Sequence, residues 1–401
     1  MGFLNKFLGR APIPTKEAQS PFTFSFLGGF TFDGVVNSDT AMRHTAVYTC
    51  VDIIASSLAS VALNVYKRDE GKRVLAQNHP LYEILKYSPN PYLTRFDYIR
   101  MWAQDILLRG NHYSQIVRNQ KGEIIGLYPL KADNMQVKLT TKGQKVFIYK
   151  TAEKEYALTQ DEVFHTLGLP GPDGLTGINP IEYNRKAIEL SMTTEQFGIN
   201  FFKNGANGSG ILKHPKVLSD KAFERLRKEF EDAYTGLRNS GKPIILEEGM
   251  DYVRLTLSNE DSQFLDTRRF QKTEIAALFK VPPYMLGDMS KATFNNMEQM
   301  MTNFVMNCLM PHAVNFELAA KKYLLRNKSF YVKFNLNALM RGDFKTRTEG
   351  YRTLINIGAL TPNEVRELEE FNAKGAEADE LYMQMNMAPL KNLAKGEDEN
   401  D

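Results

Sequence analysis

The chain has 401 residues, of which 43% are hydrophobic and 24% are charged, and its formal net charge is +3. These proportions are ordinary for a folded globular protein with a large core, and so small a net charge gives no argument for a nucleic-acid or membrane partner. No run of about 18 uncharged apolar residues occurs and the first residues do not form a signal peptide, so we expect synthesis in the cytosol and no membrane partner.

The first 40 residues show no sustained periodicity, but phenylalanines recur at even spacing. They stand at Phe22, Phe24, Phe26, Phe30 and Phe32. Such alternation is typical of a segment that presents one face to another surface. We therefore expect residues 1–40 to form an N-terminal arm that docks, either on its own subunit or on a neighbouring one.

Residues 41–178 combine helical and strand-like patterns and predict an α+β domain. Apolar residues spaced four, three, four and three apart from Val47 to Val61 indicate a helix from about Thr40 onward. Further helices are expected at 81–86 and 94–108. Alternating runs separated by turn-forming residues then predict strands at 112–118, 123–130, 135–140, 145–150 and 154–158.

Two long helical patterns flank a small insertion in the middle of the chain. The first follows the capping residue Asn179, begins at Pro180 and runs to about Lys203, a length of about 35 Å. The insertion, residues 210–257, has the pattern strand, helix, strand, strand. The second long helix ends at the prolines 282 and 283, because neither residue can continue it.

The segment 284–296 follows these prolines and carries one acid, Asp288, and one base, Lys291, so its formal charge is zero. A loop that grips DNA phosphates would carry several lysines or arginines, because neutralising phosphates supplies much of the affinity for DNA. Helical periodicity resumes at Phe294 and meets Pro311 in mid-pattern, where the lost hydrogen bond predicts a kink.

The C-terminal part predicts a strand at 330–335 and helices at 344–357 and 362–371. Thr361 and Glu364 form a capping-box pattern at the start of the last helix. From residue 376 to the end the chain has seven acids and two lysines, and we expect a disordered acidic tail.

The sequence contains no pattern that supports catalysis, a metal site or a cofactor. Segment 236–242 has the spacing of a phosphate-binding loop, but Pro243 replaces the required hydroxyl residue and a helix, not a strand, precedes the segment. The six histidines are scattered singly and are expected to be structural. Cys50 and Cys308 are expected to be buried free thiols. We therefore predict that the protein is not an enzyme.

Several short blocks occur in a fixed order along nearly the whole chain. They are GNHY at 110–113, GLYPL at 126–130, FFKNGA at 201–206, NEDSQF at 259–264, EIA at 274–276 and FKVPPYMLG at 279–287, followed by Asn296, Glu298 and Pro311. Each block alone is weakly specific. Their order and spacing resemble those of phage portal proteins of the HK97-like type.

The resemblance implies an α+β portal fold that assembles as a ring. It assigns 1–40 to an N-terminal arm, 41–178 to the wing, 179–205 to a stem helix, 206–258 to the clip, 259–283 to a second stem helix, 284–296 to the tunnel loop, 297–334 to a kinked helix and a wing strand, 335–375 to the crown helices, and 376–401 to the acidic disordered tail.

The resemblance also implies a ring-shaped channel, expected to have twelve subunits, at one capsid vertex of the virion. Double-stranded DNA would be packaged and ejected through it with non-specific, weak contacts. The implied protein partners are the terminase large subunit, head-completion or adaptor proteins, and the major capsid and scaffold proteins, met in the host cytoplasm during assembly.

Within this interpretation the tunnel loop approaches DNA through Met289, Ser290, Lys291, Thr293, Asn295 and Asn296. The clip docks partners through Arg238, Asn239 and Lys242. The alternative is a ring-forming or scaffold adaptor protein that has no DNA channel.

Overall fold

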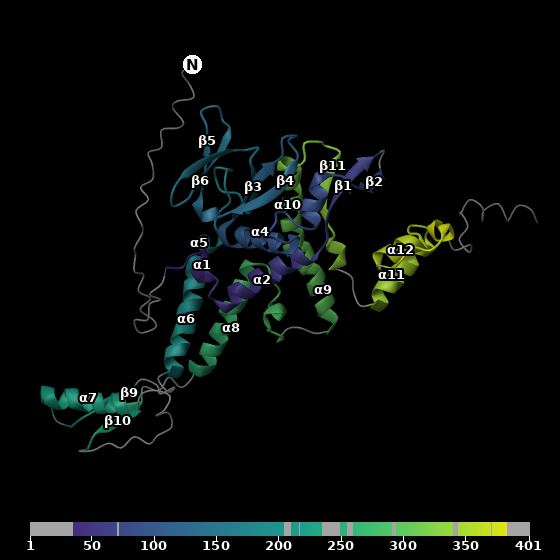
Figure 1. Cartoon of the computed structure of the whole chain (residues 1–401). Helices are drawn as coiled ribbons and strands as arrows, with labels where there is room; N and C mark the ends of the chain where they lie inside the picture. Colours follow the sequence, from purple (N-terminus) through teal and green to yellow (C-terminus); the bar gives the residue numbers. More distant parts are fainter. Residues whose placement is uncertain are drawn as a thin grey trace, which may run out of the picture. The chain divides into compact units, whose positions relative to one another are not determined.

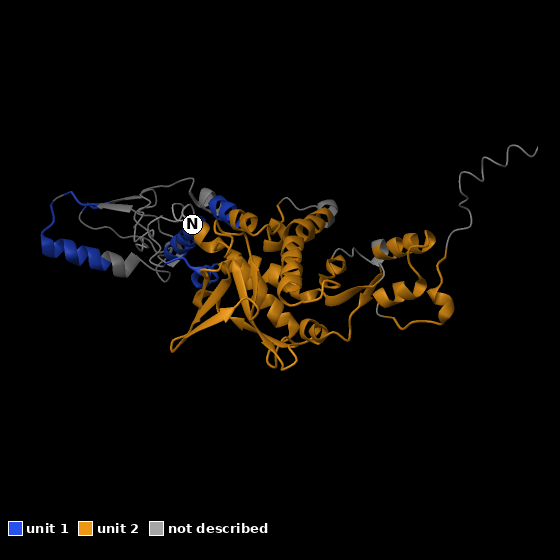
Figure 2. Ribbon diagram, turned by 90° about the horizontal axis from the view of Figure 1, so that it is seen from above, with its two compact units in different colours: residues 1–44, 184–272 blue, residues 45–183, 273–401 orange. Residues whose placement is uncertain are grey.

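The computed structural model describes residues 35–69, 72–203, 210–215, 217–234, 249–254, 260–290, 294–339, 344–369 and 371–382 (Figure 1). The chain divides into two compact units (Figure 2). The smaller unit comprises residues 1–44 and 184–272, and the larger comprises residues 45–183 and 273–401. Helices and strands are mixed along the chain, as the α+β prediction expected.

The larger unit contains three-stranded antiparallel sheets. One has the order β11-β1-β2, formed by Phe330–Phe334, Leu63–Asp69 and Lys72–Leu75. Another has the order β4-β3-β8, formed by Ile124–Leu130, Asn111–Arg118 and Val163–Leu167. The third has the order β5-β6-β7, formed by Met135–Leu139, Lys145–Lys150 and Glu155–Thr159. The pairing of β1 with β11 joins the two sequence segments of the larger unit, 45–183 and 273–401.

One helix connects two of these sheets through an aromatic core. Helix α10 (Met310–Tyr323) packs on β8 and β11, and α2 (Thr45–Ser60) packs on α4 (Arg95–Arg109). The Phe316 ring of α10 lies 5.0 Å from Trp102, 5.4 Å from Phe164 and 5.5 Å from Phe334, measured between ring centroids. Edge-to-face packing of buried aromatic rings stabilises such a core beyond the area it buries.

Most elements predicted for this unit are present, with two corrections. The helices expected at 81–86 and 94–108 are α3 (Pro80–Lys86) and α4. The helix expected from Thr40 begins only at Thr45, because Asn37 caps a separate short helix, α1 (Ser38–Ala41), which ends before it. Strands β1, β2 and β8 were not predicted.

The smaller unit contains α6 (Arg185–Lys203) and α8 (Glu260–Leu278) as far as residue 272, and these two helices lie side by side and run in opposite directions (Figure 1). The buried Gln271 side chain donates a hydrogen bond to Thr194 Oγ1 at 2.9 Å and joins them. The unit also contains β9 (Gly210–Lys213), α7 (Asp220–Tyr234) and β10 (Asp251–Arg254), with β9 and β10 antiparallel. The third strand predicted for 210–257 lies outside the described residues.

The helix predicted to run unbroken from Pro180 is instead two helices. Asn179 does cap its start, since Asn179 Oδ1 accepts a hydrogen bond from the Ile181 amide at 3.0 Å. The short α5 (Pro180–Tyr183) ends there, and α6 begins after Asn184. The cap prediction is confirmed, and the prediction of one continuous helix was wrong.

The C-terminal helices are α11 (Phe344–Asn356) and α12 (Pro362–Leu368), followed by the short turn η7 (Ala376–Asp379). The predicted capping box is confirmed: Thr361 Oγ1 accepts from the Glu364 amide, and Glu364 Oε2 accepts from the Thr361 amide. The acidic tail beyond residue 382 lies outside the described residues. Along the described ranges, no helix is both long enough and apolar enough to span a bilayer.

Candidate functional site

The segment predicted to be functional begins where α8 stops. The Lys280 amide donates to Ala277 O and the Val281 amide donates to Ala276 O, a bonding pattern that closes a helix C-terminus. Lys280 has φ +57, a left-handed conformation that usually requires glycine. Pro282 follows and the chain leaves the helix, as predicted from the proline pair.

A short 3-10 turn, η4 (Pro283–Leu286), and a left-handed Gly287 then reverse the chain. Asp288 Oδ1 accepts hydrogen bonds from the Ser290 amide at 3.1 Å and from the Ser290 hydroxyl at 2.6 Å. The Met289 side chain is 55% exposed. The described part of this segment is therefore a compact turn that presents Met289 to solvent.

The six residues predicted to face DNA are placed to different degrees. Met289 and Ser290 lie on the turn, and the Ser290 hydroxyl is engaged by Asp288. Asn295 and Asn296 belong to the first turn of α9 (Phe294–Phe304). Lys291 and Thr293 lie outside the described residues, as do Arg238, Asn239 and Lys242 of the predicted clip site.

The helix after this segment contains a π-helical turn. Helix α9 continues into η5 (Val305–Leu309), a π-turn, and then into α10. The Met310 amide donates to Val305 O, five residues back. Pro311 has no amide hydrogen and its ring crowds the preceding turn, so a wider turn before it relieves both problems. The prediction at Pro311 was a kink; the structure shows a π-turn just before the proline, and the kink itself stays a prediction.

Comparison with known proteins decides the family of the chain. A family model described as "Phage portal protein" matches residues 45–370. The portal protein of Enterobacteria phage HK97 is 30% identical over 352 residues, which cover 84% of this chain and 81% of that protein. The chain belongs to the phage portal protein family.

Solved structures share the fold of this portal-family chain. The crystal structure of an HK97 family phage portal protein from Corynebacterium diphtheriae has a TM-score of 0.58 at 18% identity and covers 77% of this chain and 98% of its own. A chain from the neck of a native gene transfer agent (GTA) particle, computed with C12 symmetry, has a TM-score of 0.56 at 22% identity and covers 84% of this chain and 94% of its own. The portal fold, of α+β class, is therefore shared across these proteins.

The portal-family block GNHY has a clear structural basis. Gly110 ends α4 with φ +72, and a Cβ added there would lie 1.8 Å from Ile178 O. Asn111 Oδ1 accepts from the Gly177 amide at 2.7 Å, and Asn111 Nδ2 donates to Gly177 O at 2.8 Å. No side chain fits at Gly110 without moving the backbone opposite. The block therefore fastens the loop before α5 to the end of α4.

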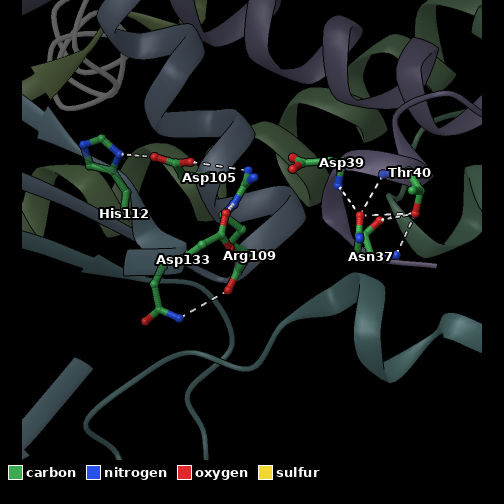
Figure 3. A network of polar contacts seen from close by, with 8 residues as sticks. Asn37, Asp39, Thr40, Asp105, Arg109, His112 and Asp133 are labelled. Atoms are coloured by element: carbon green, nitrogen blue, oxygen red, sulfur yellow. Dashed lines mark hydrogen bonds and ion pairs between the residues drawn. The ribbon is translucent and has the colours of Figure 1, made fainter. Parts of the chain in front are cut away.

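His112 of the same block belongs to a buried polar network (Figure 3). His112 Nδ1 lies 2.8 Å from Asp105 Oδ2, and His112 Nε2 lies 2.9 Å from Ser114 Oγ. This is the atom order of a catalytic triad, but His112 and Ser114 are 0% exposed, so no substrate can reach the hydroxyl. The Ser114 hydroxyl is also hydrogen-bonded to Tyr98 OH at 2.9 Å.

The charged side of this network continues through Arg109, which lies 3.8 Å from Asp105 and 2.7 Å from Asp133 (Figure 3). The network thus links α4, β3 and the turn η2 (Ala132–Asn134). The interpretation of His112 as a structural histidine is confirmed. No cluster of potential metal ligands occurs among the residues that the structure describes.

His165 and the cysteines also agree with the structural interpretation. His165 Nε2 lies 3.2 Å from Asn111 Oδ1, and its ring stacks on Tyr113 with centroids 4.4 Å apart. Burial, with a smaller contribution from the Lys145 cation, lowers the pKa of His165 to about 2, so it is neutral. Cys50 and Cys308 are buried thiols that form no disulfide, as predicted.

Proposed function

We propose that this chain is the subunit of a portal ring through which double-stranded DNA passes into and out of a phage capsid. The observation that carries the proposal is the family match along residues 45–370. A ring is supported by the C12 symmetry with which the related neck structure was computed. A twelve-subunit assembly at one capsid vertex, present in the virion and formed in the host cytoplasm, is the simplest arrangement consistent with both.

The segment 284–296 is the proposed DNA-facing loop, with Met289, Ser290, Lys291, Thr293, Asn295 and Asn296 closest to the duplex. Its formal charge of zero supports this role. A ring of many lysines would release many counterions on binding and would hold DNA tightly, whereas a neutral loop offers weak contacts that allow DNA to move. The exposed Met289 on a compact turn can make such contacts.

The proposed protein partners are the terminase large subunit, head-completion or adaptor proteins, and the major capsid and scaffold proteins. Terminase and adaptor proteins would dock on the clip, residues 206–258, through Arg238, Asn239 and Lys242. Flanking helix α7 supports a docking role, because it carries charges of both signs and exposes 54% of Phe223.

Electron microscopy of the purified full-length protein tests the ring, and native mass measurement gives its copy number. We expect rings with an open central hole. Particles that stay monomeric at every concentration, or a ring whose centre is filled by protein, would contradict the proposal. A filled ring would favour the alternative, an adaptor or scaffold without a DNA channel.

A charge change in the loop tests the contact with DNA. Asn295→Lys with Asn296→Lys adds two cations per subunit, and we expect rings to form normally while bound DNA becomes harder to release by salt. Lys291→Ala is the matched control, since it removes the loop's single base and should leave assembly intact. If DNA release depends on salt in the same way in both variants, the loop does not contact DNA.

A further inference from the structure

Two backbone irregularities of the larger unit meet at one contact. One is Lys280, which among the described residues is the non-glycine residue with a positive φ. The other is the π-turn η5. Each is an energetically unfavourable conformation that packing must hold in place, and such features recur at functional positions.

The contact between them is a hydrogen bond from the Cys308 thiol to Phe279 O, with the sulfur 3.3 Å from the oxygen. Cys308 lies in the π-turn, and Phe279 is the residue directly before Lys280. The last carbonyls of a helix have no partner within the helix, so the thiol supplies a donor to an acceptor at the end of α8.

The contact is buried, and its surroundings keep the thiol protonated, so that it can donate. Phe279 is 5% exposed and Cys308 is 2% exposed, and Val281, Val305 and Leu309 around them are also buried. Burial raises the pKa of Cys308 to about 12, and the Lys280 cation opposes this only partly. The thiol is therefore protonated at physiological pH and can donate to Phe279 O.

The segment between the two ends of this contact is the one that carries the proposed DNA-facing residues. It leaves the contact at Lys280, passes through η4 and returns through α9 to the π-turn. A helix advances by about 100° per residue, so the extra residue of a π-turn decides the rotation of α9 relative to α10. Helix α2 also packs on both η4 and η5, which supports a fixed arrangement.

We propose that Cys308 is a positioning residue whose thiol joins the C-terminus of α8 to the π-turn, and so sets the rotation of α9 relative to α10 and restrains residues 281–290 and 294–304. The part of this inference that concerns DNA rests on the proposed function. The joint itself does not, because it is made of described contacts within one chain. The competing explanation is that Cys308 only fills apolar volume beside a turn that Pro311 causes.

Two substitutions separate these explanations in the full-length assembled protein. Cys308→Val keeps an apolar side chain and removes the donor, whereas Cys308→Ser keeps the donor and is more polar. Hydrogen–deuterium exchange should be about two- to fivefold faster in peptides from 281–304 of Cys308→Val, as the loss of a weak hydrogen bond predicts. Cys308→Ser should exchange there like the wild-type protein.

A residue of β5 provides the control. Val137→Ala removes apolar volume from the cluster that Val137 forms with Tyr113, Phe147 and Val163, away from the contact, and should leave exchange at 281–304 within the range of the wild type. The opposite ranking, with Cys308→Ser looser than Cys308→Val, would overturn the proposal in favour of apolar packing. The same local loosening in Val137→Ala, or faster exchange everywhere in Cys308→Val, would also overturn it.

DNA retention per assembled particle distinguishes this proposal from the proposed function. We expect Cys308→Val to lower it and Cys308→Ser to preserve it. If Cys308→Val loosens 281–304 and DNA retention does not change, the joint stands and only its effect on DNA is rejected. If retention falls without local loosening, the joint is rejected. The DNA-facing role of the loop is decided separately, by the salt dependence of Asn295→Lys with Asn296→Lys.

Discussion

The sheets of the larger unit, with the helices α4 and α10 that pack on them, form a sheet region that is held together differently from the C-terminal helices. In the sheet region Trp102, Phe164 and Phe316 are fully buried, and the Phe316 ring packs against both other rings. Along the described residues from 344 to 382, only Asn363 is classed as buried, at 9% exposure. Apolar side chains of that segment remain exposed, namely Leu354, Ile357, Leu368, Phe371, Leu381 and Tyr382.

Polar contacts take the place of a core in the C-terminal helices. Asn363 donates to Lys374 O and to Asp379 and accepts from the Lys374 amide. Glu369 accepts from Arg347 and from Tyr351. Such contacts fix geometry but contribute little net stability, while burial of apolar area drives folding. The sheet region thus has a buried core of its own, and the C-terminal helices have an exposed apolar surface that a neighbouring subunit in the proposed ring could cover.

The largest expected effect comes from removing the buried tryptophan of the sheet region. Trp102→Ala deletes a side chain that is 0% exposed and whose indole donates to Thr166 Oγ1 at 2.8 Å. We expect the free energy of unfolding to fall by about 3–5 kcal/mol, measured by chemical denaturation. Phe371→Ala, at a side chain 62% exposed, is the control and should change it by less than about 0.5 kcal/mol. Similar losses in both variants would contradict the contrast between the two regions.

The next largest effect is expected from acid, which should lower the stability of the sheet region more than that of the C-terminal helices. Burial, with a smaller contribution from Lys280, lowers the pKa of His312 to about 4, and residues 344–382 contain no histidine. As pH falls from 6.5 to 4, the unfolded chain takes up a proton at His312 and the folded chain does not. Stability is therefore full above pH 6.5 and is lost toward pH 4, by up to about 1.4 kcal/mol per pH unit.

The test of this acid sensitivity is the slope of stability against pH. His312→Gln should flatten that slope between pH 6.5 and 4, and the part due to His165, whose pKa is also lowered, should remain. The unfolding of the larger unit, followed by tryptophan fluorescence, reports it because Trp102 is the chain's one tryptophan. An unchanged slope would mean that His312 is not kept neutral by the fold.

The sequence predicts these two regions unequally, and the reason is physical. Local signals located the helix at Arg95–Arg109, the cap at Thr361 and the stop at Pro282. Strand β1 was missed because its partner β11 lies at the other end of the domain, and no local pattern reports so distant a pairing. Strand β8 was missed because it is short and almost wholly buried, which leaves no alternation to read.

The candidate site shows the same limit. The loop's position between two helices and its zero charge were readable from residues 284–296. The left-handed Lys280 was not, because a lysine gives no sign of a position that normally takes glycine. The contact of Cys308 with Phe279 was also hidden, since it depends on a π-turn whose exact register a proline pattern does not determine.

Removing the hydrogen bonds that Glu369 accepts in the C-terminal helices should have a smaller, local effect. Glu369→Ala removes the acceptor for Arg347 and Tyr351, and we expect about 1–2 kcal/mol less local stability in residues 344–379. Faster proteolysis within that segment would report the loss, while the thermal unfolding of the sheet region stays unchanged. Glu367→Ala, at an exposed acid on α12, should leave proteolysis as in the wild type. Loss of stability of the sheet region in Glu369→Ala would show that the two regions are coupled.

The smallest effect concerns a difference in how the two regions use left-handed positions. After α11 the chain uses Gly358, with φ +67, whereas after α8 it uses Lys280. A left-handed conformation costs a non-glycine residue about 1–2 kcal/mol. Glycine avoids this cost but loses more conformational entropy on folding, which offsets part of the gain. Lys280→Gly should therefore raise the free energy of unfolding by about 0.5–1 kcal/mol.

Gly287→Ala provides the reciprocal control for Lys280→Gly. Gly287 has φ +86 and nothing lies within 4 Å of an added Cβ, so its substitution tests backbone strain alone. We expect Gly287→Ala to lower the free energy of unfolding by about 1 kcal/mol, whereas Lys280→Gly should raise it. Both variants are measured in the same denaturation series. If Lys280→Gly is destabilising while Gly287→Ala behaves as expected, the Lys280 side chain contributes more than its backbone strain costs. Its cation beside His312 and Cys308 would then be part of what holds the end of α8.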